Sequence, residues 1–369
     1  MSKPTFKGGV HPPEFKELCE KEKIEPFPIP EKVIIPLAQH LGAPSKPLVN
    51  VGDEVKTGDP ISEPQGFVSV PVHSSVTGKV KKIAEYPHPL GVSMTAVEIE
   101  TSEEEVWNDK IKFNPDYMNK TNEEMINDIK NAGLAGMGGA TFPTHVKLSP
   151  PKEKKMEIAI LNGAECEPYL TSDHRLMLEH TEDIVNGFKI IMKILGANTG
   201  IIGIENNKMD AVEAMKKAVQ SESNISVVVL PVKYPQGGEK QLIDALTGRQ
   251  VPSGGLPMDC GCLVSNVGTA KAIYDAVSSN KPLIERVVTV TGRSIKNRKN
   301  YLVRIGTSYN ELLTSCGLGE EFKGKIISGG PMMGIAQCSR EVPVIKGTSG
   351  IVVLEENEVV TDEQLPCIS

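Results

Sequence analysis

The stretch GLAGMGGATFPTHVK, residues 133–147, holds four glycines within its first seven residues and ends on a lysine. Because glycine has no side chain, its backbone amide can approach a phosphate group or a flat ring closely. Lys147 follows at a distance from which its ammonium can reach an anion. These features predict a binding loop for an anionic, planar ligand. On composition alone, a flexible loop without a ligand is the alternative.

The pattern before this loop distinguishes it from a dinucleotide-binding fingerprint. Residues 121–124, TNEE, match a capping box, which predicts a helix that carries Met125, Ile126 and Ile129 and ends at Gly133. The dinucleotide fingerprint requires a strand before its glycines. The loop follows a helix, so it is not that fingerprint.

Beyond the loop, strand and helix patterns alternate, which is typical of a parallel α/β sheet. Apolar residues at helical spacing predict a helix from about Leu176 to Leu195 that stops at Gly196. The other predicted elements are strands at 157–161, 200–204 and 225–230 and a helix at 209–219. Together they indicate a Rossmann-like α/β domain over residues 115–284.

Polar residues follow the apolar segments of this predicted sheet, where ligands bind in open α/β folds. Asn162 can both donate and accept hydrogen bonds, while Glu165 and Glu167 can accept from ribose hydroxyls or a ring NH. A helix begins after YPQGGE at residues 234–239, and its N-terminus favours an anion. Ser265-Asn266 follows a further apolar stretch. For the two glutamates, a solvated acidic turn is the alternative.

The residues before the α/β domain predict two different units. Residues 1–30 are rich in proline and charge, which indicates an extended segment that lies along another domain. Residues 31–105 show short β-branched runs broken by glycine and indicate an all-β barrel-sandwich hybrid domain. It is similar to a lipoyl carrier, but its hairpin at 64–67, PQGF, has no lysine for attaching a cofactor. We therefore expect a docking or covering role.

The residues after the α/β domain again show strand patterns. Residues 285–355 indicate an α+β module of the β-grasp (SLBB) type, built around one helix at 308–316. Residues 356–369 follow it and contain Pro366-Cys367-Ile368-Ser369. The predicted fold class is thus a multidomain α/β protein, with the Rossmann-like domain between an all-β and an α+β domain.

Composition excludes several functions. The chain has 369 residues and a formal net charge of −7, which argues against nucleic acid as its main partner. Its apolar runs are shorter than the roughly 20 residues of a transmembrane helix, and its N-terminus lacks the apolar core of a secretory signal. Seven cysteines without small-domain spacing argue against a disulfide framework. We expect a cytoplasmic, reducing location.

Taken together, the four motifs resemble the flavin-binding core of the flavoprotein subunit of respiratory complex I. The resemblance implies that FMN is contacted by one set of residues and that NADH is faced by Phe142 and Glu167. The residues that match FMN-contacting positions are Gly136, Gly138, Gly139, Lys147, Asn162, Glu165, Tyr234, Gly237, Glu239 and Asn266. Three positions depart from that core, because Met137 replaces an arginine, Ala164 an aspartate and Gly238 an acid.

Those departures, the opening GGVHPPE and the late SGGPMMG at residues 328–334 make the whole chain more similar to the RnfC family, the flavin- and NADH-binding subunits of Rnf electron-transport complexes. The resemblance implies an oxidoreductase subunit that moves electrons between NADH and iron–sulfur clusters through FMN. It implies other Rnf membrane subunits, a ferredoxin-like subunit and ferredoxin as partners. It also implies a peripheral position on the cytoplasmic face of the cell membrane.

The resemblance further implies two [4Fe–4S] clusters in the full-length protein. Cys367 matches the first ligand of the C-x-x-C-x-x-C-x-x-x-C-P run that holds such clusters. The sequence stops two residues later, so we expect the clusters to be incomplete in this chain. Two other functions remain open: a related cobalamin-reducing flavoprotein, and a scaffold of the same fold without a cofactor.

Overall fold

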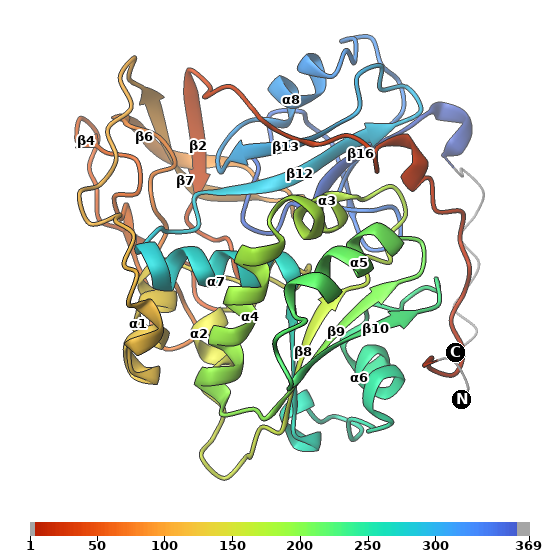
Figure 1. Ribbon diagram of the computed structural model, residues 1–369. Coiled ribbons are helices and arrows are strands. Elements are labelled where there is room, and N and C mark those ends of the chain that lie inside the picture. Colours follow the sequence, from red (N-terminus) through yellow and green to blue (C-terminus); the bar gives the residue numbers. More distant parts are fainter. Residues whose placement is uncertain (1–3, 360–369) are drawn as a thin grey trace.

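Four parallel strands form the sheet of the central domain (Figure 1). The computed structural model describes residues 4–359. The strand order is β10-β9-β8-β11, and every neighbouring pair is parallel. The strands are β8 Ile158–Gly163, β9 Thr199–Glu205, β10 Ile225–Leu230 and β11 Cys262–Asn266. The prediction of a parallel α/β sheet is therefore confirmed.

Helices cover both faces of this sheet (Figure 1). Leu161 and Ile202 point into a core shared with α4, α5 and α7. Ile160 and Val264 point to the opposite face, where α6 supplies Leu242. The helices of the domain are α1 Asn122–Asn131, α2 Thr144–Lys147, α3 Ser172–Glu179, α4 Thr181–Leu195, α5 Met209–Ala218, α6 Glu239–Thr247 and α7 Val267–Ser279. The alternation of side chains along each strand thus produces a three-layer domain.

The first predicted helix boundary is confirmed, and the second prediction needs correction. Thr121 and Glu124 form the expected capping box of α1, and Gly133 adopts a left-handed φ of 68° after its end. The single helix predicted from about Leu176 to Leu195 is in fact two helices, α3 and α4, separated at His180. His180 has a φ of −128°, outside the helical range, and its ring contacts Asp183 at 3.2 Å. Sequence spacing did not reveal this break, because apolar residues are buried on both sides of it, Leu176 and Met177 in α3 and Ile184 in α4.

The all-β unit lies N-terminal to this domain. Its main sheet has the order β2-β7-β6-β4 and all pairs are antiparallel. A second, two-stranded sheet pairs β3 with β5. The strands are β2 Lys32–Pro36, β3 Lys46–Pro47, β4 Glu54–Val55, β5 Ser62–Glu63, β6 Gly78–Pro87 and β7 Ser93–Thr101. The hairpin at 64–67 exposes Phe67 and brings its carbonyl oxygen 3.3 Å from the His145 ring.

The C-terminal module is a six-stranded mixed sheet of order β1-β13-β12-β16-β14-β15. Its one helix, α8 Tyr309–Ser315, begins at the capping residue Ser308 as the pattern predicts. The strands are β12 Glu285–Gly292, β13 Lys299–Arg304, β14 Lys325–Ser328, β15 Ile335–Gln337 and β16 Gly350–Leu354. The edge strand β1, Ile24–Pro26, comes from the N-terminal segment and pairs with β13.

The N-terminal segment lies along two other domains. Figure 1 shows it in red, running up one side of the view from near β10 to the sheet that contains β12 and β13. Val10 pairs with Tyr234 of the central domain through two backbone hydrogen bonds of 2.8 Å. Four short 3₁₀ helices complete the described chain: Lys16–Leu18, Tyr117–Asn119, Pro257–Cys260 and Glu356–Glu358. Among residues 4–359, none of the helices combines the length and apolarity needed to span a membrane.

Candidate functional site

The glycine-rich loop presents free backbone at the surface of the central domain. Gly138 and Gly139 are exposed, and their amides donate to no protein acceptor within residues 4–359. Gly139 has a φ of +117°, and a side chain built there would meet nothing within 4 Å. The two ends of the loop are fixed, because Gly136 donates to the Phe142 carbonyl at 2.9 Å and the Met137 amide donates to Thr269 Oγ1 at 2.9 Å. The loop is therefore held in place with open amides at its tip.

Asn266 joins this loop to the sheet. It ends β11 and caps α7, since its Oδ1 accepts from the amides of Gly268 and Thr269. A Cβ atom added to Gly138 would lie 3.2 Å from the Cβ of Asn266, so the loop and Asn266 are closely packed at this glycine. The Nδ2 of Asn266 donates to Asp173 Oδ2 at 2.6 Å. The side chain of Asn266 is thus fully engaged in holding the loop, α7 and α3 together.

Asn162 lies beside Asn266, because the two residues are paired across β8 and β11. Its Nδ2 donates to the Gly237 carbonyl at 2.9 Å. The Gly237 amide in turn donates to the Cys166 sulfur at 3.3 Å. Burial raises the pKa of that thiol to about 11, so it remains protonated at neutral pH. These contacts draw the turn after β10 onto the carboxyl end of β8.

Glu165 points away from the loop, toward the N-terminus of α3. Its carboxylate accepts from the amide of Asp173 at 2.7 Å and from that of His174 at 3.3 Å, where the helix dipole favours negative charge. Lys16 lies 3.9 Å away, and both side chains are only 5% exposed. Burial raises the pKa of Glu165, while the ammonium of Lys16 opposes that shift. Glu165 therefore serves to position α3 rather than to offer free oxygens.

Lys147 and Glu239 form an ion pair of 2.6 Å between the end of α2 and the start of α6. Both side chains are more than a third exposed, so the pair contributes little to stability. The ammonium of Lys147 therefore remains available to an anionic ligand at low energetic cost. This pair places the lysine beside the Tyr234–Glu239 turn.

Glu167 lies between the central domain and the C-terminal module. Its Oε1 accepts from the Tyr234 hydroxyl at 3.3 Å, and its Oε2 accepts from the Met332 amide at 3.1 Å. Burial raises the pKa of this carboxyl, and the Met332 amide opposes the shift. A Cβ atom at Gly330 would collide with it at 2.1 Å. The SGGPMMG loop at 328–334 therefore packs against Glu167, the residue that the resemblance assigns to NADH, and leaves it partly exposed.

The structure links the twelve candidates that fall within residues 4–359. One series of contacts leads from the loop through Asn266 and Asp173 to Glu165. A second leads from Asn162 through Gly237 to Cys166, which lies between Glu165 and Glu167. Phe142 joins through Gly136, while Lys147 joins through Glu239. Cys367 lies outside the described residues. Within them, no three His, Cys, Asp or Glu side chains gather in a way that suits a metal ion.

Other charged residues of the site were not found from sequence. Lys208 is buried and donates to the Ala164 carbonyl at 2.8 Å and to Glu205 at 3.2 Å. Asp173 links Asn266 to α3, and burial raises its pKa. Lys16 reaches the site from the N-terminal segment. None lies in a motif, so only the tertiary structure brings them together.

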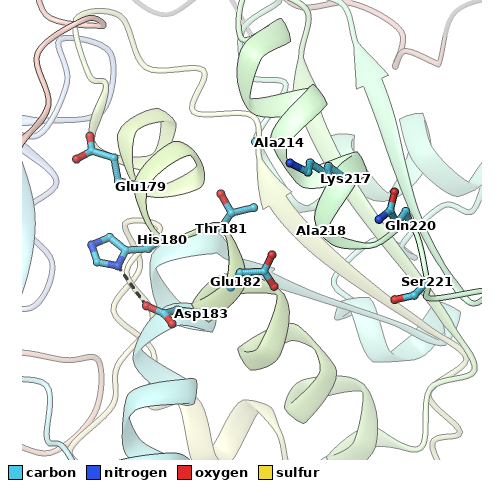
Figure 2. Close-up of a pocket in the computed structure, with 10 residues that line it drawn as sticks. All are labelled: Glu179, His180, Thr181, Glu182, Asp183, Ala214, Lys217, Ala218, Gln220 and Ser221. Carbon is cyan, nitrogen blue, oxygen red and sulfur yellow. Dashed lines mark hydrogen bonds and ion pairs between the residues drawn. The ribbon is translucent and has the colours of Figure 1, made fainter.

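The donor set fits a flavin mononucleotide. Open amides at Gly138 and Gly139 suit a phosphate or a ring carbonyl, and Lys147 adds a positive charge nearby. The described part of the chain also holds a cleft between the α3–α4 junction and the end of α5 (Figure 2). Its lining includes Glu182, Lys217 and the His180–Asp183 pair, but none of the candidate residues. It is therefore separate from this site.

Comparison with known proteins agrees with this organisation. The model of the Nuo51 FMN-binding domain matches residues 129–275, that of the RnfC barrel sandwich hybrid domain matches 4–104, and that of the SLBB domain matches 287–336. The NAD⁺-reducing [NiFe]-hydrogenase in its H₂-reduced state has a similar fold, with a TM-score of 0.55 at 19% identity. That likeness covers 66% of this chain and 48% of the hydrogenase chain. The predicted fold class is confirmed.

Two curated relatives match nearly the whole chain. The C subunit of the proton-translocating ferredoxin:NAD(+) oxidoreductase complex of Clostridium ljungdahlii is 50% identical over 364 residues, covering 99% of this chain and 79% of the relative. The C subunit of the Na(+)-translocating complex of Acetobacterium woodii is 47% identical, covering 99% and 82%. The chain therefore belongs to the RnfC family, the C subunits of the ion-translocating ferredoxin:NAD⁺ oxidoreductase complexes known as Rnf complexes.

Proposed function

We propose that this chain binds FMN non-covalently between the glycine-rich loop and the carboxyl ends of β8 and β11, and exchanges electrons with NADH there. The observation that carries the proposal is the pair of open amides at Gly138 and Gly139, held against Asn266 on a domain that matches an FMN-binding family. Bound FMN supplies the hydride and single-electron chemistry. The residues of the protein bind FMN, orient it and shield it from solvent.

Each candidate has a distinct role in this proposal. The amides of Gly138 and Gly139 and the ammonium of Lys147 hold the anionic and polar parts of FMN. Asn162 and Asn266 fix the turns that form the walls, through their bonds to Gly237 and to α7. Glu165 orients α3 through its first amides. The same walls are also shaped by Gly136, Tyr234, Gly237 and Glu239.

NADH approaches on the side of Phe142 and Glu167. Glu167 offers a carboxylate that its neighbours already hold in a fixed direction, which suits recognition of ribose hydroxyls. Phe142 offers an aromatic surface next to the loop. No side chain would be required as a general base, because bound FMN would itself supply the redox chemistry with NADH.

In the complex, we propose that electrons would pass on from the flavin through iron–sulfur clusters, with Cys367 as one ligand. The relatives named above belong to complexes that couple ferredoxin and NAD(+) to ion translocation. This chain would then be the NADH-binding subunit, peripheral to the membrane on its cytoplasmic face. Its partners would be the other Rnf subunits, including the ferredoxin-like one, and through them ferredoxin.

The test is whether the purified protein carries FMN that NADH reduces. We expect a flavin absorption spectrum, release of all the flavin into the supernatant on acid precipitation, and bleaching of the flavin band by NADH without oxygen. A colourless protein that does not take up added FMN would favour the scaffold alternative. Reduction of a cobalamin by the NADH-reduced protein would favour the other flavoprotein family.

A matched pair of variants tests the location. Gly139 and Gly91 are both exposed, both have positive φ, and a Cβ atom at either would meet nothing within 4 Å. Gly139→Val and Gly91→Val therefore each place a β-branched side chain on a strained backbone, with φ of +117° and +78°. We expect only Gly139→Val to lose FMN, at least fivefold in affinity, which is about 1 kcal/mol. Equal flavin content in the two variants would place the cofactor elsewhere.

A further inference from the structure

Lys16 is a buried cation that the roles above do not use. Its side chain is 5% exposed, and its Nζ donates to the Leu170 carbonyl at 2.6 Å and to the Glu167 carbonyl at 3.0 Å. Glu165 Oε2 lies 3.9 Å from the same atom. One ammonium from the N-terminal segment thus contacts three points of a segment about 150 residues away. The contacted residues include both glutamates of the candidate site.

The contact between these segments also concentrates backbone strain. Of the five non-glycine residues with positive φ in the described chain, Phe15, Glu165 and Tyr169 meet here. Phe15 stacks on Tyr169 with ring centroids 4.7 Å apart, and the Tyr169 amide donates to the Glu14 carbonyl at 2.8 Å. Such residues each cost on the order of 1 kcal/mol and persist only where neighbours enforce them. The two segments therefore hold each other in their observed conformations.

The same N-terminal residues also hold the turn after β10. Val10 exchanges two backbone hydrogen bonds with Tyr234, whose hydroxyl contacts Glu167. Lys233 donates to the Phe6 carbonyl at 2.8 Å, and its ammonium lies 4.3 Å from the Phe6 ring centroid. We call residues 6–19 the N-terminal strap. The strap therefore contacts both the segment that contains Glu167 and the turn that contains Tyr234.

Charge explains why a lysine occupies this position. Lys16 lies 3.9 Å from Glu165, and Lys208 lies 3.2 Å from Glu205, so each buried ammonium faces a carboxylate. Burial lowers the pKa of Lys16 and raises those of Glu165 and Glu205, and the opposite charges counter these shifts. The ammonium of Lys16 donates hydrogen bonds to two carbonyls, while the Glu165 carboxylate at 3.9 Å contributes charge attraction and no hydrogen bond. An apolar residue here would leave Glu165 with less compensation and two carbonyls without a donor. The consequence would be a loosened 165–170 segment.

We infer that Lys16 is a positioning residue for the NADH side of the site, acting through the strap on Glu167. This inference rests on the proposed function, because it assigns a role in NADH binding. The strap orders the 165–170 segment before the nucleotide arrives. Without that order, NADH binding would also have to order Glu167. This cost would weaken NADH binding without changing the flavin chemistry.

The test compares Lys16→Met with two controls, using the purified flavoprotein. Lys21→Met removes an exposed lysine from the same N-terminal region. Val97→Ala lowers stability by opening the core of the all-β domain, away from the strap. The measurements are flavin content, KM and kcat for NADH, and the Kd of NAD⁺ by calorimetry. We expect Lys16→Met to raise KM and Kd about tenfold, equivalent to about 1.4 kcal/mol, with kcat and flavin content within about twofold of wild type.

The outcomes separate this inference from the proposed function. Wild-type KM and Kd in Lys16→Met, or a similar rise in Val97→Ala, would overturn the inference and leave the proposed function intact. A wild-type protein without flavin or NADH reactivity would instead overturn the proposed function. If Lys16→Met does not fold, Phe15→Leu keeps the cation and removes the stacking on Tyr169. We expect Phe15→Leu also to raise KM with little change in kcat. An unchanged KM in this variant would contradict the role of the strap.

Discussion

The Nζ atom of Lys346 lies 2.7 Å from the carbonyl oxygen of Gly133, the first glycine of the loop. It also donates to the Pro71 carbonyl at 3.0 Å. A single side chain of the C-terminal module thus connects the central domain to the all-β domain. Burial lowers the pKa of this lysine to about 7, because its two described partners are uncharged carbonyl oxygens.

This pKa predicts how stability depends on pH. Native Lys346 loses its proton near pH 7, whereas an unfolded lysine keeps it until about pH 10.5. Between these values the unfolded state binds more protons, so the contribution of Lys346 to stability rises with pH, by up to about 1.4 kcal/mol per pH unit. The nearby rings of His40 and His73 have lowered pKa values, that of His73 to about 3, and stay neutral in this window.

The variant Lys346→Met removes this dependence. Urea unfolding of both proteins at pH 6, 7, 8 and 9 should show the free energy of unfolding of wild type rising relative to the variant above pH 7. Parallel curves across that range would mean that the lysine keeps its proton, for example through bound water.

Replacing Glu167 with glutamine should weaken NADH binding and leave FMN in place. In the proposed site the carboxylate lies on the nucleotide side, and in the described chain its hydrogen-bond partners are Tyr234 and Met332, outside the glycine-rich loop. We expect a severalfold higher KM for NADH, as for the loss of one charged hydrogen bond, at unchanged flavin content. Glu103→Gln, at an exposed position, is the control. Loss of flavin with an unchanged KM would mean that the pocket has the opposite orientation.

Thiol labelling should distinguish the cysteines by burial. Cys338 is exposed, whereas burial raises the pKa of Cys19 to about 12 and those of Cys166 and Cys316 to about 11. Since the thiolate is the reactive form, iodoacetamide at pH 7.5 should modify Cys338 well before the other three. Peptide mass spectrometry in buffer and in urea gives the comparison. Rapid native labelling of Cys166 would show that the 165–170 segment opens.

Local signals predicted much of the fold. The capping box at Thr121 and the left-handed Gly196 fix two helix ends from adjacent residues alone, and the helix start at Ser308 was also predicted. The strand at 225–230 was predicted at its observed bounds. The break at His180 was missed, because apolar residues are buried on both sides of it. The start of α3 also depends on a residue outside the helix, since Glu165 accepts from its first amides.

The candidate site was only partly accessible from sequence for a related reason. Glycine loops and polar residues at strand ends are local patterns, so most candidates could be named. Lys16 and Lys346 lie in no motif, and their partners are backbone carbonyls more than 150 residues away. Every residue has a backbone carbonyl, so a carbonyl partner cannot be recognised from a sequence pattern. Such residues become visible only when the domains are placed together.

Gln236 provides the last prediction. It is fully buried beside Gly237, and neither Nε2 nor Oε1 of its amide has a partner in the described chain. An unsatisfied buried polar group costs about 1–3 kcal/mol. Methionine has a similar length without those polar atoms. Gln236→Met should therefore raise the free energy of unfolding of the flavin-free protein by about 1 kcal/mol.

Gln39→Met is the matched control, because Gln39 is also buried but satisfied. Its Nε2 donates to the Pro36 carbonyl at 2.9 Å and its Oε1 accepts from the Lys346 amide at 3.0 Å. The same substitution should lower stability there by about 1–3 kcal/mol, since two partners lose their hydrogen bonds. Urea unfolding followed by circular dichroism measures both. If Gln236→Met is destabilised as much as Gln39→Met, then Gln236 has a partner such as an internal water, and its amide belongs to the structural network of the turn.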